Sequence, residues 1–311
     1  MTTADSGVSQ ANWVELTPAD PRYPVQLAAV PGCPSPLYVR GDPGVLALPQ
    51  LAIVGSRAAT SAGKETAFEF ASVLAAAGLA ITSGLAIGID AAAHRGALAA
   101  GGVTIAVCGT GLDRVYPPGH VQLAGVIAER GALVSEFAPG MPPLAENFPQ
   151  RNRLMSGLSL GVLVIEAAAR SGSLITARHA GEQGREVLAV PGSIHNPLAR
   201  GCHRLIKDGA ALVETPDDVL TALGLAARAW PANSSAESAQ FAENSADRLD
   251  SGAEMLLNAL GFGPADLDRL VERTGLAVHV VVSTLQMLEL AGRVESLSGG
   301  RFCRTASRHT K

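Results

Sequence analysis

Short apolar runs alternate with longer helical patterns between residues 50 and 223. The apolar runs have the length of strands and show no polar alternation: 51–54, 80–82, 103–107, 132–135, 161–165, 187–190 and 211–213. The segments between them have helical spacing: 63–77, 89–100, 120–130, 148–158, 174–184 and 201–207. Continuously apolar strands are typical of a sheet that is covered on both faces. The pattern therefore predicts an α/β fold with a Rossmann-like, doubly wound and mostly parallel sheet.

The pattern changes after residue 223. A polar and acidic stretch without periodicity, 224–250, predicts a linker. Beyond it lie three short helical patterns and two strand-like runs about Gly299-Gly300: 253–260, 266–273, 278–290, 293–297 and 301–304. Three helices followed by a two-stranded hairpin are typical of a small winged helix domain, which we expect over 251–307. The Rossmann-like domain is then expected over 46–223.

The first 45 residues contain seven of the 19 prolines. Because proline disrupts helix interiors, residues 1–45 predict an extended entry segment that wraps the core. Met1–Gln10 carries no Lys or Arg, which argues against a secretory signal. The uncharged stretch 71–89 is long enough to cross a membrane, but Gly78 and Gly84 interrupt it. We therefore expect a cytoplasmic protein without a membrane partner.

Composition and charge narrow the class of protein. Of the 311 residues, 47% are hydrophobic and 17% are charged, which excludes a disordered chain. The four cysteines are far apart and form no C-x-x-C pair, so neither a zinc site nor a disulfide framework is indicated. The net charge of −4 is segregated, since 151–210 carries eight Lys and Arg against four Asp and Glu. Electrostatic attraction to phosphate decays over about 10 Å at cellular salt concentration. The charge of this basic segment therefore matters more for binding phosphate than the net charge of the whole chain.

Glycine and small polar residues follow five of the predicted strands: Gly55-Ser56-Arg57, Ser83-Gly84, Gly109-Thr110-Gly111, Ser171-Gly172-Ser173 and Pro191-Gly192-Ser193. Such turns at the carboxyl ends of parallel strands, each before a helix, can bind anions through backbone N–H groups. Neither a P-loop nor a G-x-G-x-x-G fingerprint occurs, so no ATP or NAD site and no cofactor are expected.

Sequence patterns for catalysis are weak. The G-x-S-x-G string at 157–161 lies between a helical pattern and a strand, which is the wrong context for a nucleophile elbow. The pairs Asp90/His94 and His179/Glu182 have the spacing of half a metal site, although such pairs more often make capping or surface contacts. Glu166 ends a strand, where either a general base or a structural carboxylate can stand. We expect no catalytic residues and no metal.

The stretch 146–159 is the most informative. Phe148 is one of twelve aromatic residues and stands before Pro149, with Arg151 and Arg153 just beyond. An aromatic face beside guanidinium groups suits single-stranded nucleic acid, because bases stack and phosphates pair. Arg151 and Arg153 are two residues apart and point to different faces of a helix. One can therefore contact phosphate while the other supports the fold.

Several motifs, in one order along the chain, resemble a bacterial family. They are Gly55-Ser56-Arg57, then Ser83-Gly84-Leu85-Ala86-x-Gly88-Ile89-Asp90-x-x-Ala93-His94, then Thr104-Ile105-Ala106-Val107-x-Gly109-x-Gly111-x-Asp113-x-x-Tyr116-Pro117, then Phe148-Pro149-x-Arg151-Asn152-Arg153, then Glu166-Ala167, Ser171-Gly172-Ser173-Leu174-x-Thr176-Ala177 and Val190-Pro191-Gly192. Together they closely resemble the DNA-processing protein A (DprA, also called Smf) family over roughly residues 13–220, and more loosely over the tail from about 251.

The resemblance implies a function. A member of this family binds single-stranded DNA on a Rossmann-like core, forms a homodimer, protects incoming DNA during natural transformation and hands it to the recombinase RecA, without an established enzymatic activity. Carried over residue by residue, Arg57 contacts phosphate, Phe148 stacks on a base, and the other contacts come from Arg151, Asn152, Arg153, Gly172 and Ser173. Six further turn residues are additional phosphate-facing candidates: Gly55, Ser56, Ser83, Gly84, Gly109 and Gly111.

A dimer edge is not visible in composition. The last predicted strand, 211–213, is expected at an edge of the sheet, where a second copy of the chain can cover Ile206 and Leu212. Ordinary core packing explains these two residues equally well.

Two departures from the family pattern stand out. Many members carry a basic residue a few positions before the Phe-Pro pair, whereas Leu144-Ala145-Glu146 offers none, so we expect reduced affinity. Members often begin with a small helical domain, which we expect to be absent or truncated here.

Two alternative functions remain open. Nucleotide-processing phosphoribohydrolases use a similar Rossmann variety, but residues 169–176 lack their Pro-Gly-Gly-x-Gly-Thr-x-x-Glu loop. A winged helix can also read an operator as a transcriptional regulator. The expected third helix, however, offers His279, Ser283 and Gln286 but no Arg or Lys for base recognition.

Overall fold

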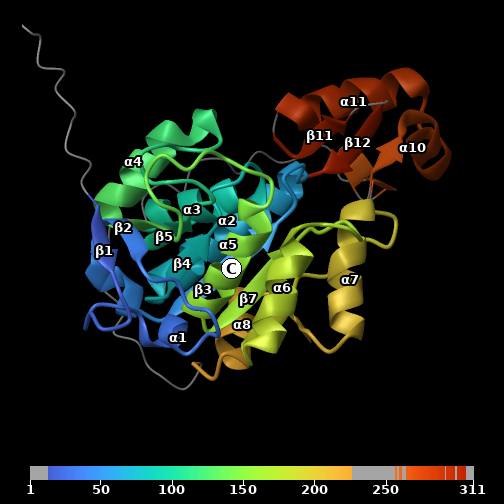
Figure 1. Ribbon diagram of the computed structural model, residues 1–311. Helices are drawn as coiled ribbons and strands as arrows, with labels where there is room; N and C mark the ends of the chain where they lie inside the picture. Colours follow the sequence, from blue (N-terminus) through green and yellow to red (C-terminus); the bar gives the residue numbers. More distant parts are fainter. Residues whose placement is uncertain are drawn as a thin grey trace, which may run out of the picture. The chain divides into compact units, whose positions relative to one another are not determined.

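The computed structural model describes residues 13–225, 256–257, 259–260, 264–290, 292–297 and 300–305, which form two compact units. The larger unit holds a nine-stranded sheet (Figure 1). In chain order, its strands are β1 (Val14–Leu16), β2 (Leu37–Gly41), β3 (Gln50–Gly55), β4 (Ala80–Ser83), β5 (Thr104–Val107), β6 (Ala132–Ser135), β7 (Gly161–Ile165), β8 (Glu186–Ala189) and β9 (Ala211–Leu212).

Helices cover both faces of this sheet. Those on one face are α1 (Val25–Ala28), α5 (Asn147–Leu158), α6 (Ser173–Glu182) and α7 (Arg200–Lys207). Those on the other are α2 (Ser61–Ala76), α3 (Ile89–Ala99), α4 (Val121–Arg130) and α8 (Pro216–Ala222). Alternate residues of one strand serve the two faces, since Ala52 and Val54 pack with α5 and α6 while Leu51 and Ile53 pack with α2 and α3. Both sets are buried, which explains the continuously apolar strands.

The strand order confirms the predicted fold class. It runs β1-β2-β6-β5-β4-β3-β7-β8-β9, and the seven strands from β6 to β9 in this order are parallel. Successive strands are added to one side from β3 to β6 and to the other side from β7 to β9, so the order reverses between β3 and β7. In doubly wound sheets, ligands bind outside the carboxyl ends of the strands at such a reversal.

The proline-rich segment contributes two strands that the sequence pattern did not predict. β1 pairs antiparallel with β2, and β2 pairs antiparallel with β6. Leu37 and Val39 are fully buried and alternate with half-buried neighbours, so β2 extends the core at this edge of the sheet. At the opposite edge, β9 is the last strand in the order, where the sequence predicted it.

The smaller unit has a hydrophobic core of its own. Its described elements are β10 (Ala265–Asp266), α10 (Leu267–Thr274), α11 (Val278–Leu290), β11 (Val294–Leu297) and β12 (Arg301–Arg304). Gly275, with a φ of 66°, turns the chain between the two helices, and β12 pairs with β10 and β11. This arrangement is a winged helix. Most of the predicted linker, 226–250, lies outside the described residues.

The uncharged stretch 71–89 contains the end of α2, β4 and the turns around them, as the glycines indicated. None of the helices described here has both the length and the apolar character needed to span a bilayer.

Candidate functional site

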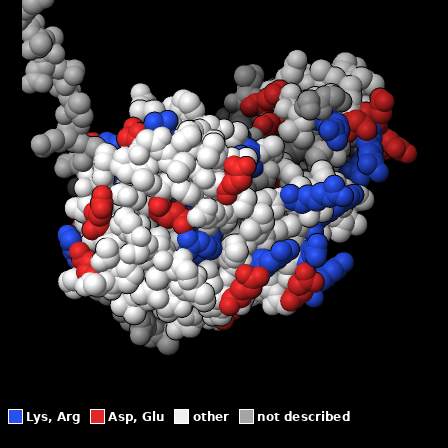
Figure 2. All heavy atoms as spheres, in the orientation of Figure 1, with Lys and Arg blue, Asp and Glu red and all other residues white. Residues whose placement is uncertain are grey.

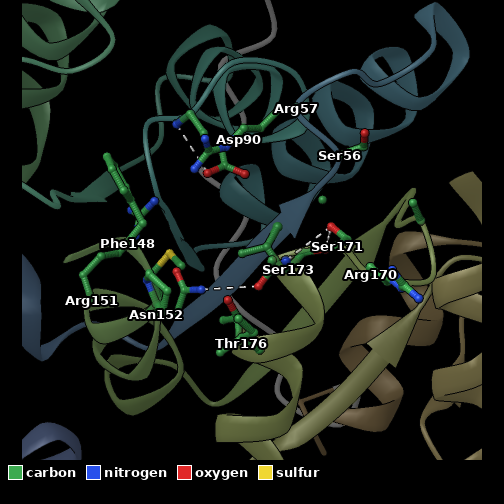
Figure 3. A pocket seen from close by; sticks show the side chains of 18 of the residues that line it. Ser56, Arg57, Asp90, Phe148, Arg151, Asn152, Arg170, Ser171, Ser173 and Thr176 are labelled. Carbon is green, nitrogen blue, oxygen red and sulfur yellow. Dashed lines mark hydrogen bonds between the residues drawn. The ribbon is translucent and has the colours of Figure 1, made fainter. Parts of the chain in front are cut away.

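A large cavity opens at the reversal point of the sheet. It has a volume of about 830 Å³ and lies beside the loops that follow β3 and β7 (Figure 3). The side chains and backbone that matter most for its chemistry are Ser56, Arg57, Asp90, Tyr116, Phe148, Arg151, Asn152, Arg170, Ser171, Gly172, Ser173 and Thr176. The first turns of α5 and α6 therefore meet the end of β3 around one space.

An aromatic and cationic cluster forms one wall of the cavity. The guanidinium carbon of Arg57 lies 5.4 Å from the centroid of the Phe148 ring, within the range of a cation–π contact. The Tyr116 ring lies 5.5 Å from the Phe148 ring, centroid to centroid, at an interplanar angle of 47°. Arg57 is exposed, Phe148 is half-buried and Tyr116 is 43% exposed. An unpaired base can thus reach an aromatic surface next to a positive charge.

The start of α5 positions Phe148. The Asn147 side chain is buried, and its Nδ2 donates hydrogen bonds to the carbonyl oxygens of Gly109 (2.9 Å) and Pro142 (3.3 Å). Gly109 also lets the ring approach the loop after β5, because a Cβ on this residue would lie 3.0 Å from the ring of Phe148. The Phe148 ring therefore packs against Gly109, which does not itself line the cavity.

Arg151 forms part of the cavity floor. It is 3% exposed, its guanidinium donates a hydrogen bond to the Val107 carbonyl oxygen, and its Nε is buried without a partner among the described residues. The guanidinium occupies the space that a side chain on Gly84 would need. Burial lowers the pKa of Arg151, while the charge of Asp90 opposes this shift.

Asp90 is a buried carboxyl group that also lines the cavity. Its Oδ2 accepts hydrogen bonds from the backbone N–H groups of Gly84 (3.1 Å) and Ala86 (3.4 Å), so it holds the loop after β4. Burial raises the pKa of Asp90, and Arg151 opposes that rise. His94, its predicted partner for half a metal site, instead makes a 2.7 Å hydrogen bond through Nδ1 to the Thr104 hydroxyl.

The opposite wall is polar and comes from the start of α6. The hydroxyls of Ser171 and Ser173 are hydrogen-bonded at 2.7 Å, and Asn152 Nδ2 donates to the Gly172 carbonyl oxygen at 3.3 Å. Gly172 is exposed, and a Cβ built on it would meet no atom within 4 Å. The hydroxyl of Thr176 is buried and makes no hydrogen bond in the part of the chain that is described. These groups can donate hydrogen bonds to phosphate or to the edge of a base.

Several predicted site residues lie elsewhere. Arg153 does not line the cavity, because it forms an ion pair with Glu136 and donates to the Gly32 carbonyl oxygen at 2.7 Å. The Ser83 hydroxyl is buried and donates to the Ile53 carbonyl oxygen at 2.6 Å. The remaining turn residues divide between the cavity (Gly55 and Ser56), a small adjoining hollow (Gly84) and positions that line neither (Gly109 and Gly111).

The residues of the expected dimer edge lie away from the cavity. Ile206 is half-buried on α7, and Leu212 on β9 is 49% exposed. Leu212 is at the edge of the sheet that β9 forms, and Ile206 packs against the hydrophobic core on one face of the sheet.

Glu166 makes contacts that support the fold. Its two carboxylate oxygens accept hydrogen bonds from the backbone N–H of Thr60 (2.8 Å) and from the Thr60 hydroxyl (2.7 Å), at the start of α2.

His179 Nδ1 lies 3.2 Å from a carboxylate oxygen of Glu182 near the end of α6. Within the described ranges, no group of three or more His, Cys, Asp or Glu side chains is placed to hold a metal ion.

Sequence reasoning did not assign Tyr116, Asp90, Thr176 or Arg170 to this site. Tyr116, Asp90 and Thr176 stood within the family motifs, whereas Arg170 stood just before one of them. Their positions in the wall depend on how separate loops meet, which spacing along the chain does not reveal.

Two protein-family models match the sequence of this chain. The model of the DNA recombination-mediator protein A family matches residues 15–224, and the model of the DprA winged helix domain matches residues 240–300. The chain belongs to the DNA recombination-mediator protein A family. The resemblance drawn from the motifs is thereby confirmed. Protein Smf of Escherichia coli is 47% identical over 295 residues, which cover 93% of this chain and 78% of that protein.

Solved structures of DNA recombination-mediator protein A relatives share the fold of the larger unit. The DprA structure from Streptococcus pneumoniae is 45% identical, covers 67% of this chain and 74% of that chain, and has a TM-score of 0.65. A structure of DNA processing protein A from Helicobacter pylori, described for its single-stranded DNA binding mode, is 29% identical and has a TM-score of 0.62. It covers 68% of this chain and 95% of that chain.

Proposed function

We propose that this chain is a single-stranded DNA-binding mediator that grips DNA in the cavity at the reversal point of the sheet. The observation that carries the proposal is the position of Arg57 over the ring of Phe148, 5.4 Å from its centroid, beside a cavity of about 830 Å³. Aromatic rings accept bases of any sequence by stacking, and arginine pairs with phosphate. The polar start of α6 supplies further hydrogen-bond donors. The Helicobacter pylori relative, described as binding single-stranded DNA, supports the same ligand.

The pocket is tested by titrating a fluorescein-labelled oligonucleotide and following its anisotropy. Phe148→Ala is expected to cost about 1–3 kcal/mol of binding if a base stacks there, which is roughly a 5- to 150-fold loss of affinity. Phe68→Ala is the matched control, since Phe68 is an exposed phenylalanine on α2 that does not line the cavity. Equal affinities of the wild type, Phe148→Ala and Arg57→Ala would refute the pocket.

The role as a mediator extends this proposal beyond DNA binding. We infer that the bound strand is protected and handed to RecA, in a cytoplasmic homodimer, as the family resemblance implies. Nuclease protection and RecA-dependent strand exchange measure the two activities separately. For the dimer edge, Ile206→Glu is expected to reduce the mass measured by light scattering, and an unchanged mass rejects this edge as the interface.

We assign the cavity a binding role and not a catalytic one. Glu166, which stands at the end of β7 where a general base would be expected, is bonded to Thr60 and holds the start of α2. Release of free base from a nucleoside monophosphate would contradict the assignment and favour a phosphoribohydrolase-like activity. A footprint on one defined operator would instead favour transcriptional regulation.

A further inference from the structure

A second groove adjoins the cavity and runs along α6. It has a volume of about 690 Å³ and lies between α6 and α7. The two spaces share part of their lining, namely Arg170, Ser171, Gly172 and Ile175. The groove therefore begins at the rim of the cavity, on the side opposite Phe148, where Figure 3 shows Arg170 beyond Ser171.

The charge of the groove changes along its length. Figure 2 shows Lys and Arg side chains gathered over α6 and α7, and Asp and Glu side chains at the lower end of the same helices. Arg170, at the cavity end, and Arg178, in the middle of α6, are exposed and make no hydrogen bond or ion pair within the described residues. The acidic residues Glu182 and Glu186 lie at and beyond the carboxyl end of α6. The half of the groove next to the cavity is thus the positive half.

The other two arginines of the groove already have partners. Arg204 Nε lies 3.5 Å from a carboxylate oxygen of Asp208, and Arg185 donates to the Gln26 carbonyl oxygen at 3.1 Å. An anionic ligand can therefore bind Arg170 and Arg178 without breaking an existing contact of either side chain.

We propose that the DNA strand leaves the cavity over Ser171 and Gly172 and continues along α6, with its phosphates on Arg170 and Arg178. This proposal rests on the proposed function, since it extends the same strand. The groove lining contains no aromatic residue, so these contacts are to the backbone and do not depend on sequence. From Ser173 to Arg178 the helix rises about 7.5 Å, which matches about two phosphates at the 3.4 Å spacing of a stacked strand.

The test uses Arg178→Ala with two labelled oligonucleotides, dT4 and dT12. Arg178 lines the groove and not the cavity, so the short oligonucleotide reports the cavity alone. For dT12, we expect a several-fold loss of affinity and a plot of log affinity against log salt that is shallower by about 0.7, the value for one phosphate contact of a single strand. For dT4, affinity and slope are expected to stay at the wild-type values. Arg130→Ala, which removes an exposed arginine from the end of α4, is the matched control.

The outcomes separate this inference from the proposed function. If wild type binds neither oligonucleotide, or binds both without dependence on Phe148, the proposed function fails. If wild type binds as expected but Arg178→Ala leaves the affinity and the salt slope for dT12 unchanged, the groove is not a path for DNA. An equal loss for dT4 and dT12 also overturns the inference, because the groove would then not be a separate subsite. Thermal melting of each variant verifies that it is folded.

Discussion

Gly84 follows β4 directly, and the guanidinium of Arg151 occupies the space where its side chain would be. Its φ lies outside the left-handed region, so alanine is compatible with the backbone here. The three atoms nearest to a Cβ built on Gly84 all belong to the Arg151 guanidinium, so the effect of Gly84→Ala is above all a collision with Arg151. Arg151 is 3% exposed and bonded to the Val107 carbonyl oxygen, so it cannot swing into solvent without opening the cavity floor.

The size of the effect follows from these contacts. Overpacking a dense core costs about 1–3 kcal/mol, and a hydrogen bond from a charged donor contributes about 1.5–3 kcal/mol. We expect Gly84→Ala to lower the free energy of unfolding by about 2 kcal/mol and the Tm of the larger unit by roughly 4–8 °C. Affinity for single-stranded oligonucleotide should fall as well, because Arg151 lines the cavity.

Thermal melting followed by circular dichroism measures the stability, with Gly125→Ala as the control. Gly125 lies within α4, and a Cβ built on it meets no atom within 4 Å. Alanine there should raise stability by roughly 0.5–1 kcal/mol, because glycine is a poor helix former. If Gly84→Ala melts at the wild-type temperature and binds DNA normally, the packing of Arg151 against Gly84 does not shape the site.

Three further variants test the contacts around the cavity. Arg153→Ala should destabilise the fold by about 3 kcal/mol in urea unfolding, because it leaves the nearly buried carboxylate of Glu136 without its cation; recovery in the double variant with Glu136→Ala would confirm the cause. Glu166→Ala should lower the Tm through loss of both hydrogen bonds to Thr60, and an unchanged Tm would contradict a structural role. Burial lowers the pKa of His94 from 6.5 to about 3, so only the unfolded chain takes up its proton between these values and stability falls as pH drops below 6.5. At pH 5 this loss is about 2 kcal/mol, and urea unfolding at pH 7 and pH 5 should show it reduced in His94→Gln.

The fold could be predicted from the sequence wherever the residues of a single segment show the hydrophobic pattern of a strand or a helix. The runs from β3 to β9 are apolar on both faces, and each is followed by a helix or a tight turn, so periodicity locates them. β1 and β2 escaped prediction because they are short and lie among prolines. β2 is held by pairing with β6, more than ninety residues along the chain, and β1 is held by pairing with β2. Such pairing is a property of the folded sheet and leaves little trace in local spacing.

The site was predictable to a similar extent. Turn chemistry and an aromatic residue at a helix start pointed to Arg57 and Phe148, which lie together. The two-residue spacing of Arg151 and Arg153 predicted different environments without indicating which arginine faces the cavity. The ion pair with Glu136 holds Arg153 outside the cavity. Glu136 comes from the loop after β6, so the spacing of the two arginines does not reveal this contact.

The three arginines of the cavity occupy different environments, and this has a consequence for salt dependence. Arg57 and Arg170 are exposed, whereas Arg151 is buried and is 3% exposed. Mobile ions screen exposed charges strongly and buried charges little. For an oligonucleotide short enough to occupy the cavity alone, the salt-sensitive part of the affinity should therefore come from Arg57 and Arg170. The part that remains at high salt should come from stacking on Phe148 and from Arg151. Arg57→Ala should accordingly reduce the salt slope, while Phe148→Ala should lower affinity equally at every salt concentration.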